Sequence, residues 1–472
     1  MSSEEAATTT TSTTTITTTT TTSTSGNNPP TAAPLRIGFL GCASIAKKNA
    51  LAILQIVESS SPEKSPSSSS CYGCCCCLTA IASRSSEKAE AFLREIVIPR
   101  ATTTTAAAGA ACSTTTTKVQ VYGGPSAYDD IIASSDVDAI YIPLPTTLHR
   151  EWATKALMAG KHVLLEKPVA MSVTEFQEIL FVAHQNRKFL MDGTMFVHHP
   201  RTRHFVQAVT TTDSNNNNNN NKYFLGRLTR IEAGFSFCGN DDFLRHNIRV
   251  QKDADPLGCL GDLGWYVIRL ALLVVMGYNN NNSSSSNNNN NVKVTYVNVA
   301  ISAQVVDYQV NEEGVPMDAT CLVWFRNNIV LSFHCGFGSH FRQYVHVVGT
   351  KRGATMDDFV LPKAHPLTYQ IQAMELTQYD LITEHEYEQV TIGAANDENS
   401  NNSEVQEVYM WRNFSRFSKA LDANEGWGDD SSSSADGVLG AARELSQIST
   451  ANQKILDALM ASIQQGGAKV AI

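Results

Sequence analysis

Short apolar runs alternate with amphipathic segments along residues 35–193. The first unit is the apolar run LRIGFL at 35–40, followed by a glycine turn and a segment with helical periodicity at 45–58. The pattern repeats with apolar runs at 78–83, 118–123, 137–145, 162–167 and 188–193, separated by helical segments at 86–97, 127–134, 147–160 and 173–187. Strands that alternate with helices predict a parallel sheet covered by helices on both faces. We therefore expect a doubly wound α/β domain over residues 35–195.

The pattern changes after residue 201, where strand-like runs follow one another with few helices between them. These runs lie at 227–237, 292–306, 319–337 and 343–356, and helical patterns lie at 261–276, 403–423 and 437–462. Strands joined without long crossovers favour antiparallel pairing. We expect residues 196–472 to form an α+β domain with a mostly antiparallel sheet and C-terminal helices.

Homopolymer runs interrupt both regions. Residues 1–34 are mostly Thr and Ser. They lack the basic start and the apolar core that a secretory signal has, and we expect a disordered tail there. Runs at 215–221 and 279–291 are rich in Asn and lie between apolar segments. Because lengthening a surface loop costs only about 0.6 kcal/mol per doubling, these runs are expected to be loops.

The net charge of −9 argues against an electrostatic nucleic-acid binder. The apolar run at 267–278 contains Arg269 and is shorter than a membrane span requires. A soluble cytoplasmic protein without a membrane partner is the expectation. Five of the 11 cysteines, Cys71 and Cys74 to Cys77, lie together without a second ligand pair at zinc spacing, so no metal site is expected. They are read as apolar residues leading into a strand, with palmitoylation and redox chemistry as alternatives.

The turn after the first strand carries GFLGCASIA, with Gly41, Ala43 and Ala46 at the G-x-G-x-x-G/A spacing. A glycine permits the tight turn, and small residues let the backbone approach a pyrophosphate and the helix pack on the strand. The helix N-terminus favours the anion. An ordinary strand-helix turn is the alternative, but the strand-helix alternation that follows favours a dinucleotide-binding Rossmann domain.

The residues at the end of the second strand are expected to determine which cofactor binds, NAD or NADP. An NAD enzyme has an acid there for the ribose 2′-OH, whereas this chain has Ser83 and Arg84. A guanidinium beside a hydroxyl suits a 2′-phosphate, which predicts NADP as the cofactor, with NAD less favoured. The alternative is that Arg84 only ends the strand at the surface.

Two further segments end strands at the carboxyl edge of the predicted sheet, where ligands bind in this architecture. One is PLPTTLH, which ends at His149, and the other is LLEKPVA, which contains Lys167. In the second domain, Asp262 and Tyr266 lie four residues apart on one predicted helix face. A hydroxyl oxidation needs a base and benefits from a nearby cation. His149 is as often a helix cap, Asp262 would also suit a helix N-terminus, and Tyr266 could be an ordinary packed aromatic.

With these motifs in place, the chain resembles the Gfo/Idh/MocA oxidoreductase family. The resemblance is carried by GFLGCASIA, PLPTTLH, HVLLEKPVA and GCLGDLGWY, and it runs from about residue 35 to the C-terminal helix. Within the family the chain is most similar to the branch of dimeric dihydrodiol dehydrogenase, NADP-dependent D-xylose dehydrogenase and plant oxidoreductases. That branch has Tyr where inositol dehydrogenases have His.

The resemblance implies a catalytic lysine at Lys167, a substrate-orienting acid at Asp262 and a general acid/base at Tyr266. It also implies the residues that surround the cofactor. These are Gly41, Ala43, Ser44, Ile45, Ala46, Ser83, Arg84, Pro143, Leu144, Thr146, His149, Glu166 and Lys167. Family members pack as dimers or tetramers, so a homodimer is expected.

The expected activity is NADP-dependent oxidation of a hydroxyl of a small molecule, either a sugar such as D-xylose or a cyclic dihydrodiol. Phe196, His198, His199 and Arg201 lead into the second domain and are candidates for substrate contacts, and so are the polar groups of the segment 235–250. The alternative function is a cofactor-binding regulatory protein without turnover, because the family includes a repressor and fold does not fix function.

Overall fold

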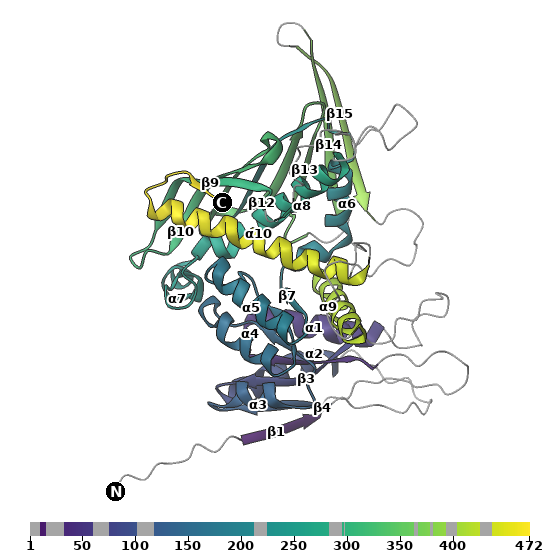
Figure 1. Cartoon of the computed structure of the whole chain (residues 1–472), viewed down its shortest axis with the longest axis vertical. Coiled ribbons are helices and arrows are strands. Elements are labelled where there is room, and N and C mark those ends of the chain that lie inside the picture. The colour runs from purple at the N-terminus through teal and green to yellow at the C-terminus, as the bar shows by residue number, and fades with distance from the viewer. Residues whose placement is uncertain are drawn as a thin grey trace, which may run out of the picture.

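The computed structural model describes residues 10–15, 33–59, 75–101, 118–211, 224–282, 295–296, 298–362, 367–377, 381–392, 404–424 and 437–472. Within these residues the chain forms two sheets, one below the other along the long axis of the molecule, with the helix α10 crossing between them (Figure 1). The predicted fold class, a Rossmann domain followed by an α+β domain, is confirmed.

The first sheet has seven strands in the order β1-β4-β3-β2-β5-β6-β7. Strands β2 to β7 are parallel, and they span Leu35–Leu40 (β2), Cys76–Ser83 (β3), Lys118–Gly123 (β4), Ala139–Ile142 (β5), His162–Leu165 (β6) and Leu190–Asp192 (β7). The direction of strand succession reverses between β2 and β5, where a doubly wound sheet binds its ligand.

Helices cover both faces of this sheet, as the alternating pattern predicts. They are α1 (Ser44–Ser59), α2 (Ser86–Ala101), α3 (Ala127–Ala133), α4 (His149–Met158) and α5 (Val173–Gln185), with a short 3₁₀ turn η2 (Thr146–Leu148) before α4. The all-buried strands β5 and β6 explain the continuous apolar runs in the sequence, because a strand covered on both faces has no polar side.

Strand β1 (Thr10–Thr15) lies in the segment that was expected to be disordered. It pairs antiparallel with β4 at the edge of the sheet. The expectation of disorder is wrong for these six residues, and their composition explains why. Threonine is β-branched and favours strands, and β4 would otherwise leave its backbone groups open at the sheet edge.

The second sheet has nine strands in the order β15-β14-β13-β12-β8-β11-β10-β9-β16. Its strands are β8 (Leu228–Cys238), β9 (Ala300–Val310), β10 (Pro316–Phe325), β11 (Val330–Gly336), β12 (Gly338–Gly349), β13 (Gly353–Asp357), β14 (Leu367–Thr377), β15 (Leu381–Ile392) and β16 (Val470–Ala471). All neighbours are antiparallel except β8 and β11. The connecting helices are η3 (Met195–His198), α6 (Pro200–Val209), α7 (Asp241–His246), η5 (Ile248–Val250), the π-helical turn η6 (Leu260–Gly264) and α8 (Trp265–Asn282), and η8 (Arg326–Asn328) is a further short turn.

Helix α8 is longer than its apolar run suggested. Its last turn includes Asn279–Asn282, which was expected to begin a loop, and the Asn281 amide donates to the backbone oxygen of Thr210 at 2.9 Å. The rest of that Asn-rich run lies outside the described residues. By length and composition Leu260–Asn281 is apolar enough to cross a membrane, but 89% of its most apolar window is buried inside the protein, as in a core helix.

The C-terminal helices are α9 (Gln406–Ala423) and α10 (Val438–Gln464), and they do not both pack on the second domain, as a domain boundary at residue 195 would suggest. Helix α10 packs on β9 and α8, whereas α9 returns to α1 and β3 of the first domain. The Trp411 ring stacks on Phe39 with centroids 6.1 Å apart, so the core of the first domain includes a residue from near the end of the chain.

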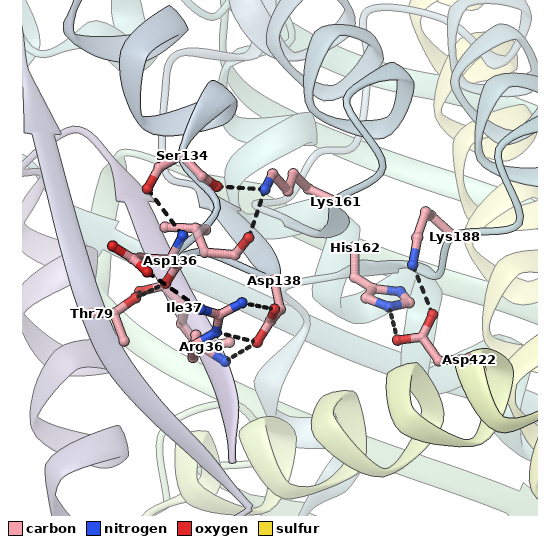
Figure 2. A network of polar contacts seen from close by, with 11 residues as sticks. Arg36, Ile37, Thr79, Ser134, Asp136, Asp138, Lys161, His162, Lys188 and Asp422 are labelled. Carbon is pink, nitrogen blue, oxygen red and sulfur yellow. Dashed lines mark hydrogen bonds and ion pairs between the residues drawn. The ribbon is translucent and has the colours of Figure 1, made fainter. Parts of the chain in front are cut away.

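A polar network at the amino end of the parallel sheet holds the far end of α9 (Figure 2). Arg36 donates to both carboxylate oxygens of Asp138, at 2.7 and 3.0 Å. Further along the sheet, the Asp422 carboxylate contacts His162 at 3.0 Å and Lys188 at 2.7 Å (Figure 2). Helix α9 is therefore fixed to the first domain by charge at this end and by aromatic packing at Trp411.

No group of three or more His, Cys, Asp or Glu side chains that could hold a metal ion occurs among the described residues. Cys76 is buried in β3, in keeping with its reading as an apolar strand residue, whereas Cys71 and Cys74 lie outside the described part of the chain. Cys75 is half-buried, and its thiol has its pKa lowered to about 7, mainly by Cys76.

Candidate active site

The turn between β2 and α1 has the geometry that the glycine motif predicts. Gly41 has φ +102°, and its N–H donates to the backbone oxygen of Ala82 at 2.8 Å. A Cβ at this position would lie 3.2 Å from Cδ2 of Leu144, which belongs to the loop after β5. Both the left-handed backbone and the close approach therefore favour glycine.

The start of α1 fits a pyrophosphate group. Ala43 and Ile45 are half-buried and Ser44 is exposed, so the first turn is open on one side. No acidic side chain lies in this turn, and the backbone N–H groups at a helix N-terminus favour an anion. Ala46 is fully buried, in keeping with the small residue that close packing of helix and strand requires.

The end of β3 places Ser83 and Arg84 beside this turn. Ser83 is buried, whereas Arg84 is exposed at the sheet edge. Tyr128 of α3 completes the corner: its hydroxyl lies 3.5 Å from the position of a Cβ on Gly41. Burial raises the pKa of Tyr128, and the neighbouring Arg84 opposes this change. Tyr128 was not among the predicted site residues, because nothing in its local sequence pattern distinguishes it from a core aromatic.

The loop after β5 borders the same edge through Pro143, Leu144 and Thr146. His149 begins α4, but its ring contacts the loop itself: Nε2 lies 2.9 Å from the backbone oxygen of Leu144. Burial lowers the pKa of His149 to about 4, so the imidazole is neutral at physiological pH. His149 thus holds the loop, and its predicted contact with the cofactor stays a prediction.

Lys167 and Asp262 meet although 95 residues separate them. Nζ of Lys167 donates to Oδ1 of Asp262 at 2.6 Å and lies 4.8 Å from the ring centroid of Tyr266. Arg249 of η5 is a second cation on the same carboxylate, with its Nε 2.8 Å from Oδ1. The structure therefore brings together the three predicted catalytic residues and adds the guanidinium of Arg249, which lies in the polar segment 235–250 but had no role of its own assigned to it.

Charge pairing decides the protonation of this cluster. The Lys167 and Asp262 side chains are only 9% and 10% exposed, and burial raises the pKa of Asp262. The two cations, Lys167 and Arg249, outweigh burial and lower the pKa to about 2. For Lys167, burial lowers the pKa, but Asp262 more than compensates and the pKa is raised. Both groups are charged at neutral pH.

The π-helical turn η6 carries Asp262 to this position. A Cβ on Gly261 would lie 2.7 Å from Cβ of Leu257 and 3.2 Å from Cγ of Pro168. Glycine therefore lets η6 approach the turn that follows β6, where Lys167 and Pro168 lie. Single π turns inside helices are frequent at functional sites.

Tyr266 is a neutral phenol in this arrangement. Its hydroxyl donates to Sδ of Met195 at 3.7 Å, and its ring packs against Phe196 and Phe235 with centroids 6.0 and 5.9 Å away. Burial raises the pKa of Tyr266 to about 12, although the Lys167 charge opposes the increase.

Glu166 points away from solvent into a chain of buried hydrogen bonds. The Tyr141 hydroxyl donates to its Oε1 at 2.5 Å, and Asn49 donates to the Tyr141 oxygen at 2.8 Å. Trp411 of α9 in turn donates to Oδ1 of Asn49 at 2.8 Å. Burial raises the pKa of Glu166. The hydrogen-bond chain from Glu166 thus reaches a helix at the end of the chain, which local sequence patterns do not reveal.

Asp255 is a further acid that sequence reasoning missed. It is 6% exposed, and its Oδ1 has no hydrogen-bond partner among the described residues. Burial and the nearby Asp262 raise its pKa to about 7, while Lys167 and a hydrogen bond with Thr146 act in the opposite direction. Asp255 therefore lies between the predicted cofactor loop and the Lys167 cluster.

The candidate substrate residues of the segment 196–201 have other partners. Arg201 is buried and donates to Asp358 at 2.7 Å, and His199 caps α6 by accepting the Arg201 N–H. His198 contacts the Asn413 amide at 3.1 Å. Only Phe196 packs on the cluster, against Tyr266. The expectation of substrate contacts is wrong for Arg201 and His199, because ion pairing and helix capping engage them.

Two family models match this chain. The model of the GFO_IDH_MocA oxidoreductase family with an NAD-binding Rossmann fold matches residues 35–194, and the GFO/IDH/MocA C-terminal domain matches residues 222–355. The chain belongs to the Gfo/Idh/MocA oxidoreductase family, as its motifs predicted. Its first domain is therefore an NAD(P)-binding domain.

Curated relatives match over part of their length. A dTDP-3,4-didehydro-2,6-dideoxy-alpha-D-glucose 3-reductase from Actinomadura kijaniata is 34% identical over 152 residues, which cover 32% of this chain and 41% of the relative. A D-xylose 1-dehydrogenase (NADP(+)) 2 from Haloferax volcanii is 31% identical over 150 residues, covering 31% and 41%. The match thus spans about two-fifths of the length of these relatives.

Solved structures share the fold over nearly the whole chain. A 3-ketoreductase from Actinomadura kijaniata in complex with NADP and TDP-benzene has a TM-score of 0.61 at 23% identity, covering 91% of this chain and 98% of that one. A levoglucosan dehydrogenase in complex with NADH and levoglucosan has a TM-score of 0.60 at 16% identity, covering 93% and 100%. These likenesses concern the fold.

Proposed function

We propose that this chain is an NADP-dependent oxidoreductase that interconverts a hydroxyl and a carbonyl group on a sugar or a cyclic diol. The observation that carries the proposal is the buried ion pair of Lys167 and Asp262 at the ligand edge of an NAD(P)-binding sheet. Nζ of Lys167 lies 2.6 Å from Oδ1 of Asp262 and 4.8 Å from the centroid of the Tyr266 ring. A solvated strand end would not need this arrangement of two opposite charges and a phenol.

The bound nicotinamide would supply or accept the hydride, and the residues of this chain would manage the proton and the charge. In the reductive direction, Tyr266 donates its phenolic proton to the carbonyl oxygen of the substrate. Lys167 stabilises the phenolate that remains, and Asp262 keeps Lys167 charged and in position. In the oxidative direction the same proton moves from the substrate hydroxyl to Tyr266.

The protonation of Tyr266 favours the reductive direction at neutral pH. With its pKa raised to about 12, the phenol holds its proton and is ready to act as an acid. Oxidation requires the phenolate, which becomes more populated as the pH rises. The 3-reductase among the curated relatives supports a keto sugar as one substrate class, and the D-xylose 1-dehydrogenase supports an aldose as another.

The preference for NADP rests on Arg84. It is exposed at the end of β3, in the position where an NAD enzyme has an acid. Its planar guanidinium can bind a 2′-phosphate through two hydrogen bonds. The D-xylose dehydrogenase relative is named for NADP(+), which agrees with this choice.

A direct experiment is to follow NADPH absorbance with aldoses, dihydrodiols, and keto sugars with and without a nucleotide carrier. The proposal expects turnover with at least one class and lower turnover in Lys167→Met and Tyr266→Phe variants. Tight NADP binding with no turnover across the panel would instead favour the regulatory protein without catalysis.

We also propose that the chain forms a homodimer. Strand β9 exposes Ile301, Val306 and Val310, which are 49%, 50% and 44% exposed. Apolar side chains gathered on one strand are typical of an interface between subunits. Light scattering coupled to size-exclusion chromatography would give the mass, and a monomer at micromolar concentration would contradict the proposal.

A further inference from the structure

An exposed phenylalanine lies next to the aromatic side chains that pack on Tyr266. Phe341, on β12, is 49% exposed. Its ring meets the ring of Phe235, on β8, edge to face with the centroids 6.5 Å apart. Phe235 in turn packs on Tyr266, with the centroids 5.9 Å apart. One aromatic ring therefore separates Phe341 from the proposed general acid.

The side chain of Phe341 belongs to the face of the second sheet that α8 covers. Helix α8 packs on β8, and its Tyr266 lies against Phe235, the residue that Phe341 contacts. The pattern of burial along β12 agrees, because every second residue from Gln343 to Val347 is buried and Phe341 precedes Gln343 by two residues. A residue of the covered face that is still exposed borders an opening in the packing.

The pairing of β12 with β8 is irregular where Phe341 lies. Gly338 of β12 is opposite Cys238 of β8. Four residues further along β12, Arg342 is opposite Ser236, which is only two residues from Cys238. The Ser236 hydroxyl donates to a backbone oxygen of this stretch at 2.9 Å, so the extra residues are held in place. Bulges of this kind occur next to active sites, where they change the direction of a side chain.

The neighbouring aromatic residues of this face are covered by other side chains. Phe237 packs on Phe243 of α7 with the centroids 5.1 Å apart, and Phe235 is buried beneath Tyr266. Among the described residues, Phe235 is the one aromatic ring that Phe341 contacts. Phe341 therefore keeps apolar surface open beside the catalytic cluster, which is the surface that a bound substrate would cover.

We propose that Phe341 determines substrate specificity: the ring of a cyclic substrate packs its apolar face on Phe341 while its reacting group lies at Tyr266. This inference rests on the proposed oxidoreductase function and adds a residue that selects the substrate. A pyranose presents C–H groups on one face, and an aromatic dihydrodiol presents an apolar ring, so both can bury area on phenylalanine. An open-chain polyol has no such face. Apolar side chains around a few polar groups are the usual form of a small-molecule site.

The first experiment measures binding without turnover. It is calorimetry of the full chain saturated with NADPH, in which an alcohol cannot be oxidised because the reduced cofactor accepts no hydride. The probes are catechol for the aromatic ring and 1,5-anhydro-D-glucitol for the pyranose, with glycerol as the open-chain control. We expect at least one cyclic probe to bind, and to bind at least ~10-fold more tightly than glycerol, since only a ring packs on Phe341. The tighter of the two cyclic probes identifies the kind of ring.

Substitutions of Phe341 then locate the contact. Phe341→Ala should weaken the tighter cyclic probe at least ~10-fold, and Phe341→Trp, which restores an aromatic surface, should stay within about 3-fold of the wild type. Phe341→Gln should lose as much as alanine and replaces it if the alanine variant does not fold. Phe181→Ala is the matched control, because Phe181 is 64% exposed but lies on α5 of the first domain, and it should leave binding unchanged.

Three results would overturn the proposal. They are binding of neither cyclic probe, equal binding of glycerol, and unchanged affinity in Phe341→Ala. A tryptophan variant as weak as the alanine variant would also overturn it, because Phe341 would then act on the shape of the strand and not on the ligand.

Turnover separates this inference from the proposed function. With a reacting cyclic substrate, Phe341→Ala should raise KM at least ~10-fold and leave kcat within about 3-fold, because packing on the ring is the same in the ground state and the transition state. Turnover with an unchanged KM in Phe341→Ala would refute the role of Phe341 and leave the enzyme function intact. Binding of a cyclic probe through Phe341 without turnover of any substrate would refute the enzyme function and leave the ring contact intact.

Discussion

Replacement of Lys167 by methionine tests the proposed chemistry most directly. Methionine keeps most of the buried volume and removes only the charge. Asp262 retains its contact with Arg249 at 2.8 Å, so the carboxylate is not left without a cation and the fold should persist. The change is therefore expected to act on turnover and not on folding.

The magnitude follows from the position of the ammonium over the tyrosine. With the phenolate charge placed at the ring centroid, 4.8 Å from Nζ, and an effective dielectric constant of about 20, the attraction is about 3.5 kcal/mol. Because each 1.4 kcal/mol corresponds to about a factor of ten in rate, turnover should decrease roughly 300-fold. The affinity for NADP should stay within about 3-fold, since the phosphate-binding turn lies on other elements.

The assay is stopped-flow absorbance of NADPH under single-turnover conditions, with cofactor affinity measured by fluorescence titration. Lys155→Met is a matched control, because Lys155 is also a paired lysine but lies exposed on α4, beside Asp129 and Glu151. A Lys167→Met variant that turns over within about tenfold of the wild type, as Lys155→Met should, would contradict the proposed role of the Lys167 charge, because its loss is expected to cost roughly 300-fold.

Three further predictions concern the surroundings of the cluster. Arg84→Ala should weaken NADP at least about tenfold while NAD changes little, since two charge-assisted bonds to the 2′-phosphate are lost; equal losses in calorimetry would contradict the cofactor assignment. Tyr141→Phe removes the hydroxyl between Asn49 and Glu166. It should lower the free energy of unfolding by about 2 kcal/mol in urea titrations, because two buried groups lose a hydrogen-bond partner. An unchanged free energy of unfolding would contradict this stabilising role of the hydroxyl. The pKa of Asp255 is about 7 in the folded state, above its unfolded value, so the folded protein binds the proton of this carboxyl more tightly. The resulting contribution to stability is therefore lost as the pH rises from about 4 to 7. Asp255→Asn should remove up to roughly 4 kcal/mol of this pH dependence between pH 4 and 8, and parallel stability curves for variant and wild type would disprove it.

Some of the site was predictable because it depends on short stretches of chain. The turn at Gly41 is a local backbone requirement, and the charged residues after β6 follow a buried run that ends at the ligand edge of a parallel sheet. Asp262 and Tyr266 are four residues apart, so a helix places them on one face. Although Asp262 lies in a π-helical turn, it still contacts Lys167. These features were visible in the sequence.

Other features depended on contacts that local patterns do not encode. Arg249 and Asp255 lie in a loop-rich segment without a motif that singles them out, yet the fold places both near Asp262, with Asp255 buried and Arg249 half-buried. Arg201 resembled a substrate contact until the structure paired it with Asp358, 157 residues later. The energy of a buried charge depends on its partner, and a partner this distant is known only once the chain has packed.

The sequence by itself determined the strand-helix alternation over residues 35–193, the two sheet types and the family, because the periodicities of strands and helices and the glycine turn are properties of neighbouring residues. Only the tertiary structure decided that α9 returns to the first domain and that Trp411 reaches Glu166 through Asn49 and Tyr141. Such contacts join segments hundreds of residues apart, and they are fixed by the packing of whole surfaces, which no short stretch of sequence specifies.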